Sequence, residues 1–237
     1  MRQVETELIV ALDVASLDEA AALLDNLGDS VTWFKIGKQI FTENGPAAVK
    51  LLKDRDKKVF LDLKFHDIPN TVAGAVRSAG HIGADMVNVH AAGGIEMMSA
   101  AVEAAREFDM FLVGVTVLTS MNAAELANTG VADEPEVQVL RLARLAREAG
   151  LDGVVCSAWE INAIQKACGP DFQLVVPGIR PAGAEHGDQK RVMTPAQAAA
   201  AGTQFIVVGR PVRRAADPRQ AAAMIKNQLQ SGREATK

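Results

Sequence analysis

The stretch Phe60-Leu-Asp-Leu-Lys-Phe-His-Asp-Ile-Pro-Asn-Thr71 begins as a predicted buried strand and ends as the start of a helix. Successive side chains on a strand point to opposite faces. Asp62 and Lys64 are therefore predicted to share one face, while Leu61 and Leu63 take the other. The strand places a carboxylate and an ammonium group side by side near its carboxyl end.

A second carboxylate follows three residues later, after the chain has turned. Asp67 precedes Ile68-Pro69, which is typical of an N-cap with proline in the first helical turn. Two carboxylates and an ammonium group then crowd one strand end. Such a group of charges is costly in a core and useful in a reaction.

Short apolar, β-branched runs recur along the whole chain, and their near-continuous apolar character indicates strands buried on both faces. Eight such strands are predicted, namely 8–13, 32–37, 59–64, 85–90, 111–119, 153–157, 173–177 and 205–209. Segments rich in Ala, Leu and Glu lie between them and predict helices at 16–27, 46–54, 71–81, 95–108, 135–149, 160–167, 195–201 and 218–229. Strands alternating with helices in this way predict a single (β/α)8 barrel domain over residues 1–237; a doubly wound open sheet is the competing fold.

Local signals refine the helix ends. Ser16 and Glu19 form a plausible capping box. The glycines expected at helix stops are Gly80, Gly83, Gly150 and Gly202. The polar tail from Gln230 to Lys237 is expected to fray.

Composition narrows the possible functions. The formal net charge of −4 provides no general attraction to nucleic acid or to acidic membranes. The first seven residues hold no apolar signal core, and the longest apolar run, 110–118, is too short to span a bilayer. The two cysteines, Cys156 and Cys168, have no metal or redox spacing and suit a reducing cytoplasm. The four histidines show no zinc spacing.

Polar residues gather at the predicted strand ends, where barrels of this type hold their active sites. These residues are Asp13, Lys35, Asp62, Lys64, Asp67, Asn88, His90, Thr119, Ser120, Arg180, Gly209 and Arg210. The loops after the last two strands commonly bind phosphate through backbone N–H groups and a cation, which suits Gly209-Arg210 and Arg180. The polar loop 180–191 resembles a lid, from which Gln189 could reach a ligand.

Structural explanations remain open for several of these residues. Asp13 could cap the helix that starts near Ser16, and Asp67 could serve only as an N-cap. Thr119 and Ser120 could cap the segment that follows them. A role for His90 is left open by the sequence, whereas His66 and His81 are expected to be solvated.

The motif Asp62-x-Lys64-x-x-Asp67 resembles the signature of the orotidine 5′-phosphate decarboxylase family. Segments along essentially the whole chain resemble that family in the same order, most closely its compact bacterial form. They are Ala11–Asp13, Phe34–Gly37, Val115–Ser120, Pro177–Arg180 with Gly187–Gln189, and Val208–Pro211.

This resemblance implies a homodimeric enzyme without a cofactor, with active sites shared between subunits. The implied reaction is decarboxylation of orotidine 5′-monophosphate to UMP, the last step of UMP synthesis. Lys64 would donate the proton within an array that includes Asp62 and Lys35 of the same chain and Asp67 of the neighbouring one.

The resemblance also implies substrate contacts. Asp13 and Lys35 would bind the ribose together with the partner's Thr71, and Ile68 and Asp67 would also contact the substrate. Thr119 or Ser120 would meet the pyrimidine, with Thr119 favoured. The implied phosphate ligands are Arg210, the Gly209 backbone, Arg180 and Gln189.

Elementary electrostatics is consistent with those roles. Loss of CO₂ leaves a carbanion at C6 that the ring cannot delocalise well, so the site must supply a fixed cation. Two unit charges about 4 Å apart interact by roughly 4 kcal/mol at an effective dielectric of about 20, and a preorganised array increases such an effect. Asp62 could raise the ground-state energy of the substrate carboxylate or mainly hold Lys64.

Two other functions compete with this one. Magnesium-dependent sugar-phosphate decarboxylases and aldolases with a similar motif need an acidic metal ligand at the end of the second strand, where this chain has Lys35. A non-catalytic nucleotide-binding module would keep Arg210 and Gln189 but would not need Asp62 and Lys64 together.

Overall fold

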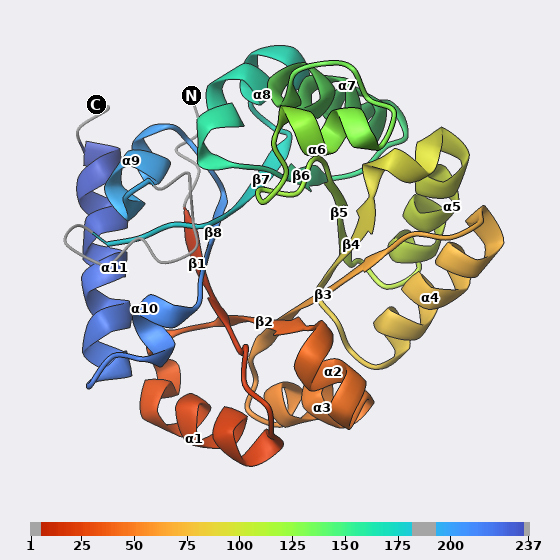
Figure 1. Ribbon diagram of the computed structural model, residues 1–237. Coiled ribbons are helices and arrows are strands. Elements are labelled where there is room, and N and C mark those ends of the chain that lie inside the picture. The colour runs from red at the N-terminus through yellow and green to blue at the C-terminus, as the bar shows by residue number, and fades with distance from the viewer. Residues whose placement is uncertain (1–5, 182–192, 235–237) are drawn as a thin grey trace.

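Eight parallel strands close into a barrel in sequence order, and helices surround it (Figure 1). The structure is a computed structural model, and it describes residues 6–181 and 193–234. The ring is closed by pairing of the first strand with the eighth, so the predicted (β/α)8 fold is confirmed and the open sheet is excluded. The predicted domain bounds, residues 1 and 237, lie outside the described residues.

The eight strands begin and end close to their predicted positions. They are β1 (Glu7–Ala11), β2 (Trp33–Gly37), β3 (Lys58–Phe65), β4 (Met86–His90), β5 (Phe111–Val115), β6 (Gly153–Val155), β7 (Gln173–Pro177) and β8 (Phe205–Val208). The predicted strand at 111–119 is too long, because β5 stops at Val115. Residues 116–119 instead run over the carboxyl end of the barrel as part of the loop before the next helix.

Helices cover the outside of the barrel between successive strands. They are α1 (Leu17–Leu27), α2 (Lys38–Asn44), α3 (Pro46–Lys53), α4 (Pro69–His81), α5 (Gly94–Arg106), α6 (Ala123–Asn128), α7 (Pro135–Glu148), α8 (Ile161–Cys168), α9 (Pro195–Ala200), α10 (Arg210–Arg213) and α11 (Pro218–Glu234). Short 3₁₀ turns follow α1, β4 and β6.

Two layers of apolar side chains hold this arrangement. One fills the barrel interior and includes Trp33, Phe60, Met86 and Phe205; the other lies between the strands and the helices. Trp33 and Phe205 begin their strands and pack edge to face with ring centroids 5.5 Å apart. The amino-terminal half of the barrel is thus closed by large side chains, and polar groups remain at the carboxyl end.

Three short helices, α2, α6 and α10, are absent from the sequence prediction. Each has seven residues or fewer, too few for an apolar periodicity to stand out. A usable signal existed for α6, since Asn122 and Glu125 form a complete capping box at its start. By contrast, α10 begins at Arg210-Pro211. The glycine and proline of this segment are typical of a loop, so no helix was predicted there.

Two predicted helix starts need correction. The N-cap of α4 is Ile68, not Asp67; the Asp67 carboxylate instead accepts from the Ile68 N–H at 2.7 Å. Ser16 caps α1 by accepting from Glu19 N–H at 3.2 Å, but the Glu19 carboxylate binds Ala15 N–H rather than Ser16 N–H. The predicted capping box is therefore only half formed.

Predicted helix ends also differ in two places. Gly83, Gly150 and Gly202 follow helices with positive φ, as expected of stops. Gly80 lies inside α4, where a side chain would clash with the Phe108 ring. The expected fraying from Gln230 is wrong as far as Glu234, because α11 continues to that residue with Gly232 buried. None of the helices in the described ranges is long and apolar enough to cross a membrane.

Candidate active site

The carboxyl ends of β1, β2 and β3 bring Asp13, Lys35, Asp62 and Lys64 together in a chain of ion pairs. Lys35 Nζ lies 3.0 Å from Asp13 Oδ1 and 3.4 Å from Asp62 Oδ2. Lys64 Nζ donates to the other carboxylate oxygen, Asp62 Oδ1. Asp62 therefore bridges two ammonium groups, and Asp62 and Lys64 lie on one face of the strand as predicted.

Burial strengthens this array. The Lys35 and Asp62 side chains are 12% and 14% exposed, whereas the Asp13 side chain is 53% exposed. Burial lowers the pKa of Lys35, but the charges of Asp62 and Asp13 more than offset it, and the pKa is raised overall. Burial likewise raises the pKa of Asp62, yet Lys35 and Lys64 bring it below its usual value. Both groups are charged near neutral pH.

An unusual backbone conformation positions Lys64. Its φ is +55°, in the left-handed region, which costs a non-glycine residue about 1–2 kcal/mol. The pairing of β3 with β4 shifts here, from Leu61 opposite Val87 to Phe65 opposite Val89. The β3 backbone thus bulges between these pairs, which places Lys64 at the barrel mouth.

Asn88, fully buried on β4, fills this bulge. Its Oδ1 accepts from the Lys64 backbone N–H at 2.7 Å, and its Nδ2 donates to Asp62 Oδ1 at 2.7 Å. The sequence placed Asn88 at a strand end but gave it no role. The signal available was a polar residue between two apolar ones, Val87 and Val89, on an otherwise buried strand.

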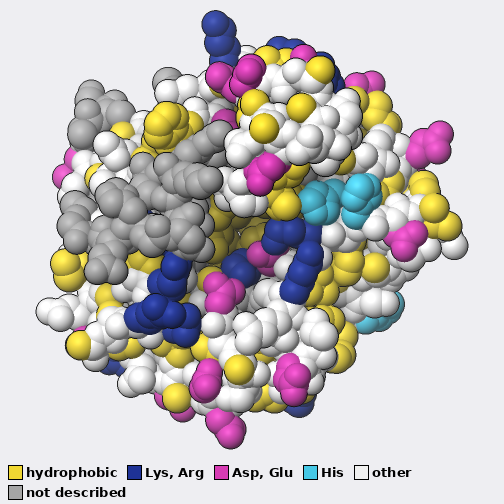
Figure 2. Space-filling model, viewed as in Figure 1, with side chains coloured by type: hydrophobic (Ala, Val, Ile, Leu, Met, Phe, Trp, Pro, Cys, Tyr) yellow, Lys and Arg dark blue, Asp and Glu magenta, His cyan; other side chains and the backbone are white. Residues whose placement is uncertain are grey.

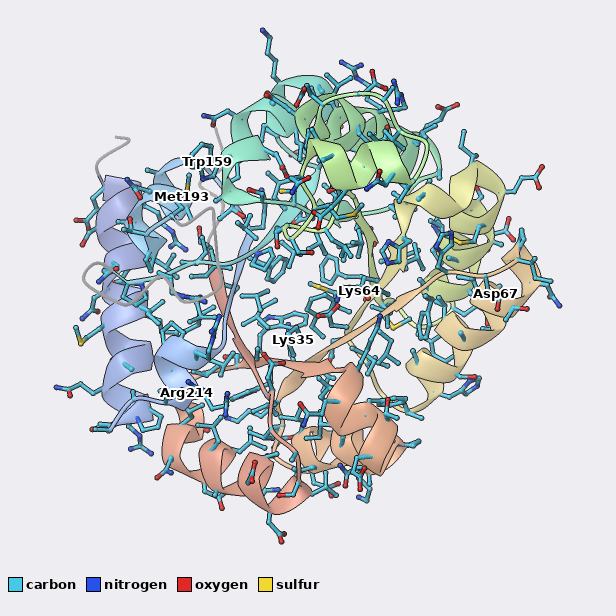
Figure 3. The ribbon with its side chains drawn as sticks, in the orientation of Figure 1. Lys35, Lys64, Asp67, Trp159, Met193 and Arg214 are labelled. Atoms are coloured by element: carbon cyan, nitrogen blue, oxygen red, sulfur yellow. The ribbon has the colours of Figure 1, made fainter. Side chains whose placement is uncertain are left out.

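Two adjoining cavities open at the barrel mouth, and Lys35, Asp62 and Lys64 line both. One, of about 200 Å³, is mainly apolar and includes Phe60, Val155, Pro177 and Thr119 in its lining. The other, of about 190 Å³, is more polar and includes Asp13, Gly37 and Lys38. Figure 2 shows the basic and acidic side chains gathered around this central hollow, and Figure 3 shows Lys35 and Lys64 beside it.

Two arginines lie close together after β7 and β8. Arg180 is 6% exposed, and its Nη1 donates to the Ile179 carbonyl at 2.9 Å. Burial lowers the pKa of Arg180, and the nearby charge of Arg210 lowers it further. Two cations that repel each other in a partly desolvated place favour a bound anion. Gly209 lies between β8 and α10, and a Cβ there would be in ordinary contact with the Asp13 and Ala11 side chains.

Asp67 does not join the array of its own chain. It lies two residues before α4 and points away from Lys35 and Lys64 (Figure 3). The residues around it are exposed, including Thr71 and Ile68, which is 67% exposed. Asp67, Ile68 and Thr71 thus form an exposed patch outside the barrel mouth.

The remaining predicted residues fall into three groups. Thr119 lines the apolar cavity, whereas its neighbour Ser120 is exposed. His90 is half-buried at the end of β4, with its ring centroid 5.4 Å from that of His66; burial and the nearby charges of His66, Lys38 and Lys64 lower its pKa. Gln189 and the predicted lid, apart from Arg180 and Pro181, lie outside the described residues.

The described ranges, 6–181 and 193–234, hold no cluster suited to a metal ion. No group of three or more His, Cys, Asp or Glu side chains within them is placed to bind one. The position at the end of β2 that would need an acidic ligand holds Lys35.

A cavity of about 480 Å³ lies elsewhere, beside α7 and the 3₁₀ turn after β4. Its charged lining residues are Asp133 and Arg141, which pair with each other at 2.7 Å. Their charges offset each other at the surface. The barrel mouth, where charged groups are desolvated and shared between two cavities, is therefore the better candidate for chemistry.

The chain is similar to known proteins over nearly its whole length. The model of the orotidine 5′-phosphate decarboxylase / HUMPS family matches residues 6–225. An orotidine 5′-phosphate decarboxylase of Sodalis glossinidius is 51% identical over 234 residues, which cover 98% of this chain and 93% of that protein. The orotidine 5′-phosphate decarboxylase of Moorella thermoacetica is also 51% identical, over 232 residues that cover 94% of this chain and 92% of that protein.

Solved structures are similar in fold. The crystal structure of orotidine 5′-phosphate decarboxylase from Lactobacillus acidophilus has a TM-score of 0.86 and 36% sequence identity. The comparison covers 94% of this chain and 99% of that one. The similarity therefore extends over the barrel and its site.

Proposed function

The chain belongs to the orotidine 5′-phosphate decarboxylase family, and we propose that it converts orotidine 5′-monophosphate to UMP and CO₂ without a cofactor, with Lys64 as proton donor. The orotidine 5′-phosphate decarboxylases that are 51% identical over nearly the whole chain make the protein a decarboxylase of pyrimidine nucleotide synthesis. The observation that carries the proposed mechanism is the position of Asp62 between two ammonium groups, Lys35 and Lys64.

The array supplies the cation that this reaction needs. When the bond between C6 and the carboxylate breaks, CO₂ leaves and the bonding electron pair stays on C6. The Lys64 ammonium stabilises that negative charge and then transfers a proton to C6, which completes UMP. Lys64 is left neutral and regains its proton from water.

Preorganisation makes this stabilisation effective. Asp62 and Asn88 fix the Lys64 side chain and backbone before substrate arrives, so little reorientation is needed during the reaction. Asp62 pairs with Lys35 through one carboxylate oxygen and with Lys64 through the other. Because its negative charge is shared between two lysines, Asp62 only partly offsets the positive charge of Lys64. We assign Asp62 mainly this holding role.

The two cavities suit the two parts of the nucleoside. The pyrimidine would occupy the apolar cavity, with Thr119 against its polar edge. The ribose would occupy the polar cavity, where its hydroxyl groups meet Asp13 and Lys35. Gly37 leaves room there, since a side chain at this position would approach Lys35 Nζ to 3.1 Å.

The phosphate would bind beside Arg180 and Arg210, at the backbone of Gly209, with Gln189 as a further ligand. A phosphate dianion would offset the repulsion between the two guanidinium groups. Arginine suits this task because its planar fork binds two oxygens at once. Binding energy from this remote group can be used at the reacting carbon.

A second copy of the chain would complete the site. The charged, exposed Asp67 lies outside its own array, beside the exposed apolar Ile68 and near Thr71. In a two-fold dimer these three residues would enter the neighbouring site, where Asp67 would complete the array around Lys64. We propose that the enzyme works as such a homodimer in the cytoplasm, which suits its two free, buried cysteines.

The name of the family model also includes a second group, HUMPS. The competing function is that of the magnesium-dependent sugar-phosphate decarboxylases and aldolases. The ammonium group of Lys35 cannot ligate magnesium and is already bound to Asp13 and Asp62. This favours the metal-free decarboxylase. Turnover of orotidine 5′-monophosphate in the presence of a chelator tests the choice, because the metal-free decarboxylase should keep its activity. A loss of activity that added magnesium restores would favour the magnesium-dependent relatives.

A further inference from the structure

Asn88 connects the backbone of Lys64 to the carboxylate of Asp62. Its carbonyl oxygen accepts from the Lys64 backbone N–H, and its amide nitrogen donates to Asp62 Oδ1, each at 2.7 Å. The same Asp62 oxygen accepts from the Lys64 ammonium group. These three contacts form a closed ring that holds both ends of Lys64.

The orientation of the Asn88 amide is set by its partners. A backbone N–H can only donate, and a carboxylate oxygen can only accept. If the amide were reversed, its NH₂ group would face the Lys64 N–H, which is also a donor, and its oxygen would face the Asp62 carboxylate, which is also an acceptor. Each half of Asn88 therefore has a separate function, which substitutions can remove one at a time.

The β3–β4 pairing explains why a side chain is needed here. The register shifts between Leu61 and Phe65, and Lys64 takes its left-handed backbone conformation within this bulge. Its N–H is bound by a side chain of β4 rather than by a β4 carbonyl. Asn88 is fully buried, so water cannot readily replace this contact.

We propose that Asn88 is a positioning residue, which sets the location and direction of the Lys64 ammonium group at the barrel mouth. The inference rests on the proposed role of Lys64 as proton donor. Asn88 acts through Lys64 and Asp62, so its loss should lower kcat much more than it raises KM. The phosphate-binding arginines follow β7 and β8, away from β4, and should still hold the substrate.

Replacing Asn88 by aspartate separates the two halves. Asn88→Asp keeps an oxygen for the Lys64 N–H but puts a second carboxylate against Asp62 Oδ1. Two carboxylates at hydrogen-bond distance share a proton, and their titration is coupled. Once protonated, the carboxyl group introduced by Asn88→Asp would again donate to Asp62 while accepting from Lys64, as the asparagine does.

The charged groups around this position are few. Strand β3 contributes Asp62 and Lys64. Strand β2 contributes Lys35, which pairs with Asp62. His90 lies farther along β4, beside His66. On β5 the paired neighbour is Val113, an apolar residue. The pH response of Asn88→Asp should therefore report mainly on Asp62 and the two lysines.

The experiment measures kcat and KM for orotidine 5′-monophosphate from about pH 5 to pH 8 in wild type, Asn88→Asp and Asn88→Ala. Thr203→Val is the matched control, because Thr203 is also fully buried and bonds to a carbonyl, at the opposite end of the barrel. We expect kcat of Asn88→Asp to fall about 100-fold at pH 8, within the range for misplaced acid catalysis. Relative to wild type, it should recover at least tenfold as the pH is lowered.

Asn88→Ala should stay slow at every pH, and Thr203→Val should keep the wild-type kcat. A kcat within threefold of wild type for both Asn88 variants would overturn the proposal, as would a loss confined to KM. A kcat loss in Asn88→Asp that is equal at every pH would mark a merely structural role and would also overturn it.

A failure of the proposed reaction is distinguishable from these outcomes. If wild type itself does not decarboxylate the substrate, the proposed function fails, and the contact is tested by hydrogen exchange of the Lys64 backbone amide. That amide should exchange slowly in wild type and at least tenfold faster in Asn88→Ala. Equal exchange would overturn the positioning role.

Discussion

Lys35 on β2 and Asp62 on β3 form an ion pair in the barrel mouth, with Lys35 Nζ 3.4 Å from Asp62 Oδ2. Burial opposes the charge on each group, yet the opposite charges around them reverse that effect. The pKa of Lys35 is raised and that of Asp62 is lowered. Lys35 and Asp62 thus stay charged in a partly buried site, where an isolated charge would raise the free energy of the folded state.

Acid stability should report on this pair. The folded-state pKa of Asp62 is below its unfolded value of about 3.9. Its contribution to the free energy of unfolding is therefore present above about pH 4 and is lost as the pH falls towards the folded-state pKa. The difference between wild type and Asp62→Asn, measured by urea unfolding, should be constant from about pH 5 to pH 8 and shrink below pH 4.

Asp54→Asn is the control for that comparison. Asp54 forms an exposed pair with Lys50 on the surface, at 2.6 Å, and such pairs contribute about 0–1 kcal/mol. Its unfolding profile should nearly overlay that of wild type. A wild-type to Asp62→Asn difference that persists unchanged below pH 3 would contradict the lowered pKa.

Arg210→Ala should weaken binding at the proposed phosphate site. Hydrogen bonds to charged groups contribute about 1.5–3 kcal/mol, so KM for orotidine 5′-monophosphate should rise at least tenfold. The value of kcat should also fall, because binding of the remote phosphate assists the chemical step. Arg77→Ala is the control, since Arg77 pairs with Glu107 on the exposed surface. Unchanged steady-state constants for Arg210→Ala would exclude it from the site.

Subunit mixing should test the proposed shared site. Lys64→Ala and Asp67→Ala homodimers should each be nearly inactive. In a mixed dimer, one site carries both defects, while the other combines an intact Lys64 with an intact Asp67 from the partner. Equal mixing makes about half of the dimers hybrid, so roughly a quarter of wild-type activity should return.

The control mixes two variants whose substituted residues belong to the array of the same chain. Asp62 and Lys64 lie on the same strand, so Lys64→Ala mixed with Asp62→Ala should recover nothing. If hybrids of Lys64→Ala and Asp67→Ala form and also stay inactive, Asp67 acts within its own chain and the shared-site proposal fails.

Strand periodicity was sufficient to predict much of this site. The alternation of Asp62 and Lys64 with Leu61 and Leu63 predicted a shared face, and the structure confirms it. The barrel topology then explains why Lys35, distant in sequence from both Asp13 and Asp62, pairs with both of them at the strand ends. These features depend on the period of a strand and on parallel order, which the sequence displays.

Other features depend on details that no periodicity reveals. The left-handed backbone of Lys64 and its bond to Asn88 follow from a local register shift. The start of α4 at Pro69 rather than after an Asp67 cap depends on a difference of one residue in local geometry. Asp67 faces away from the array of its own chain, so its proposed role in a neighbouring site does not follow from strand periodicity.

The most direct measurement is turnover of orotidine 5′-monophosphate, followed by absorbance, in wild type and Lys64→Ala with and without excess EDTA. Wild-type activity should be unchanged by EDTA, and Lys64→Ala should lose at least about 100-fold in kcat. Lys50→Ala, which removes an exposed lysine on α3, should match wild type. Wild-type activity that EDTA abolishes and magnesium restores, or a wild-type kcat in Lys64→Ala, would contradict cofactor-free decarboxylation with Lys64 as proton donor.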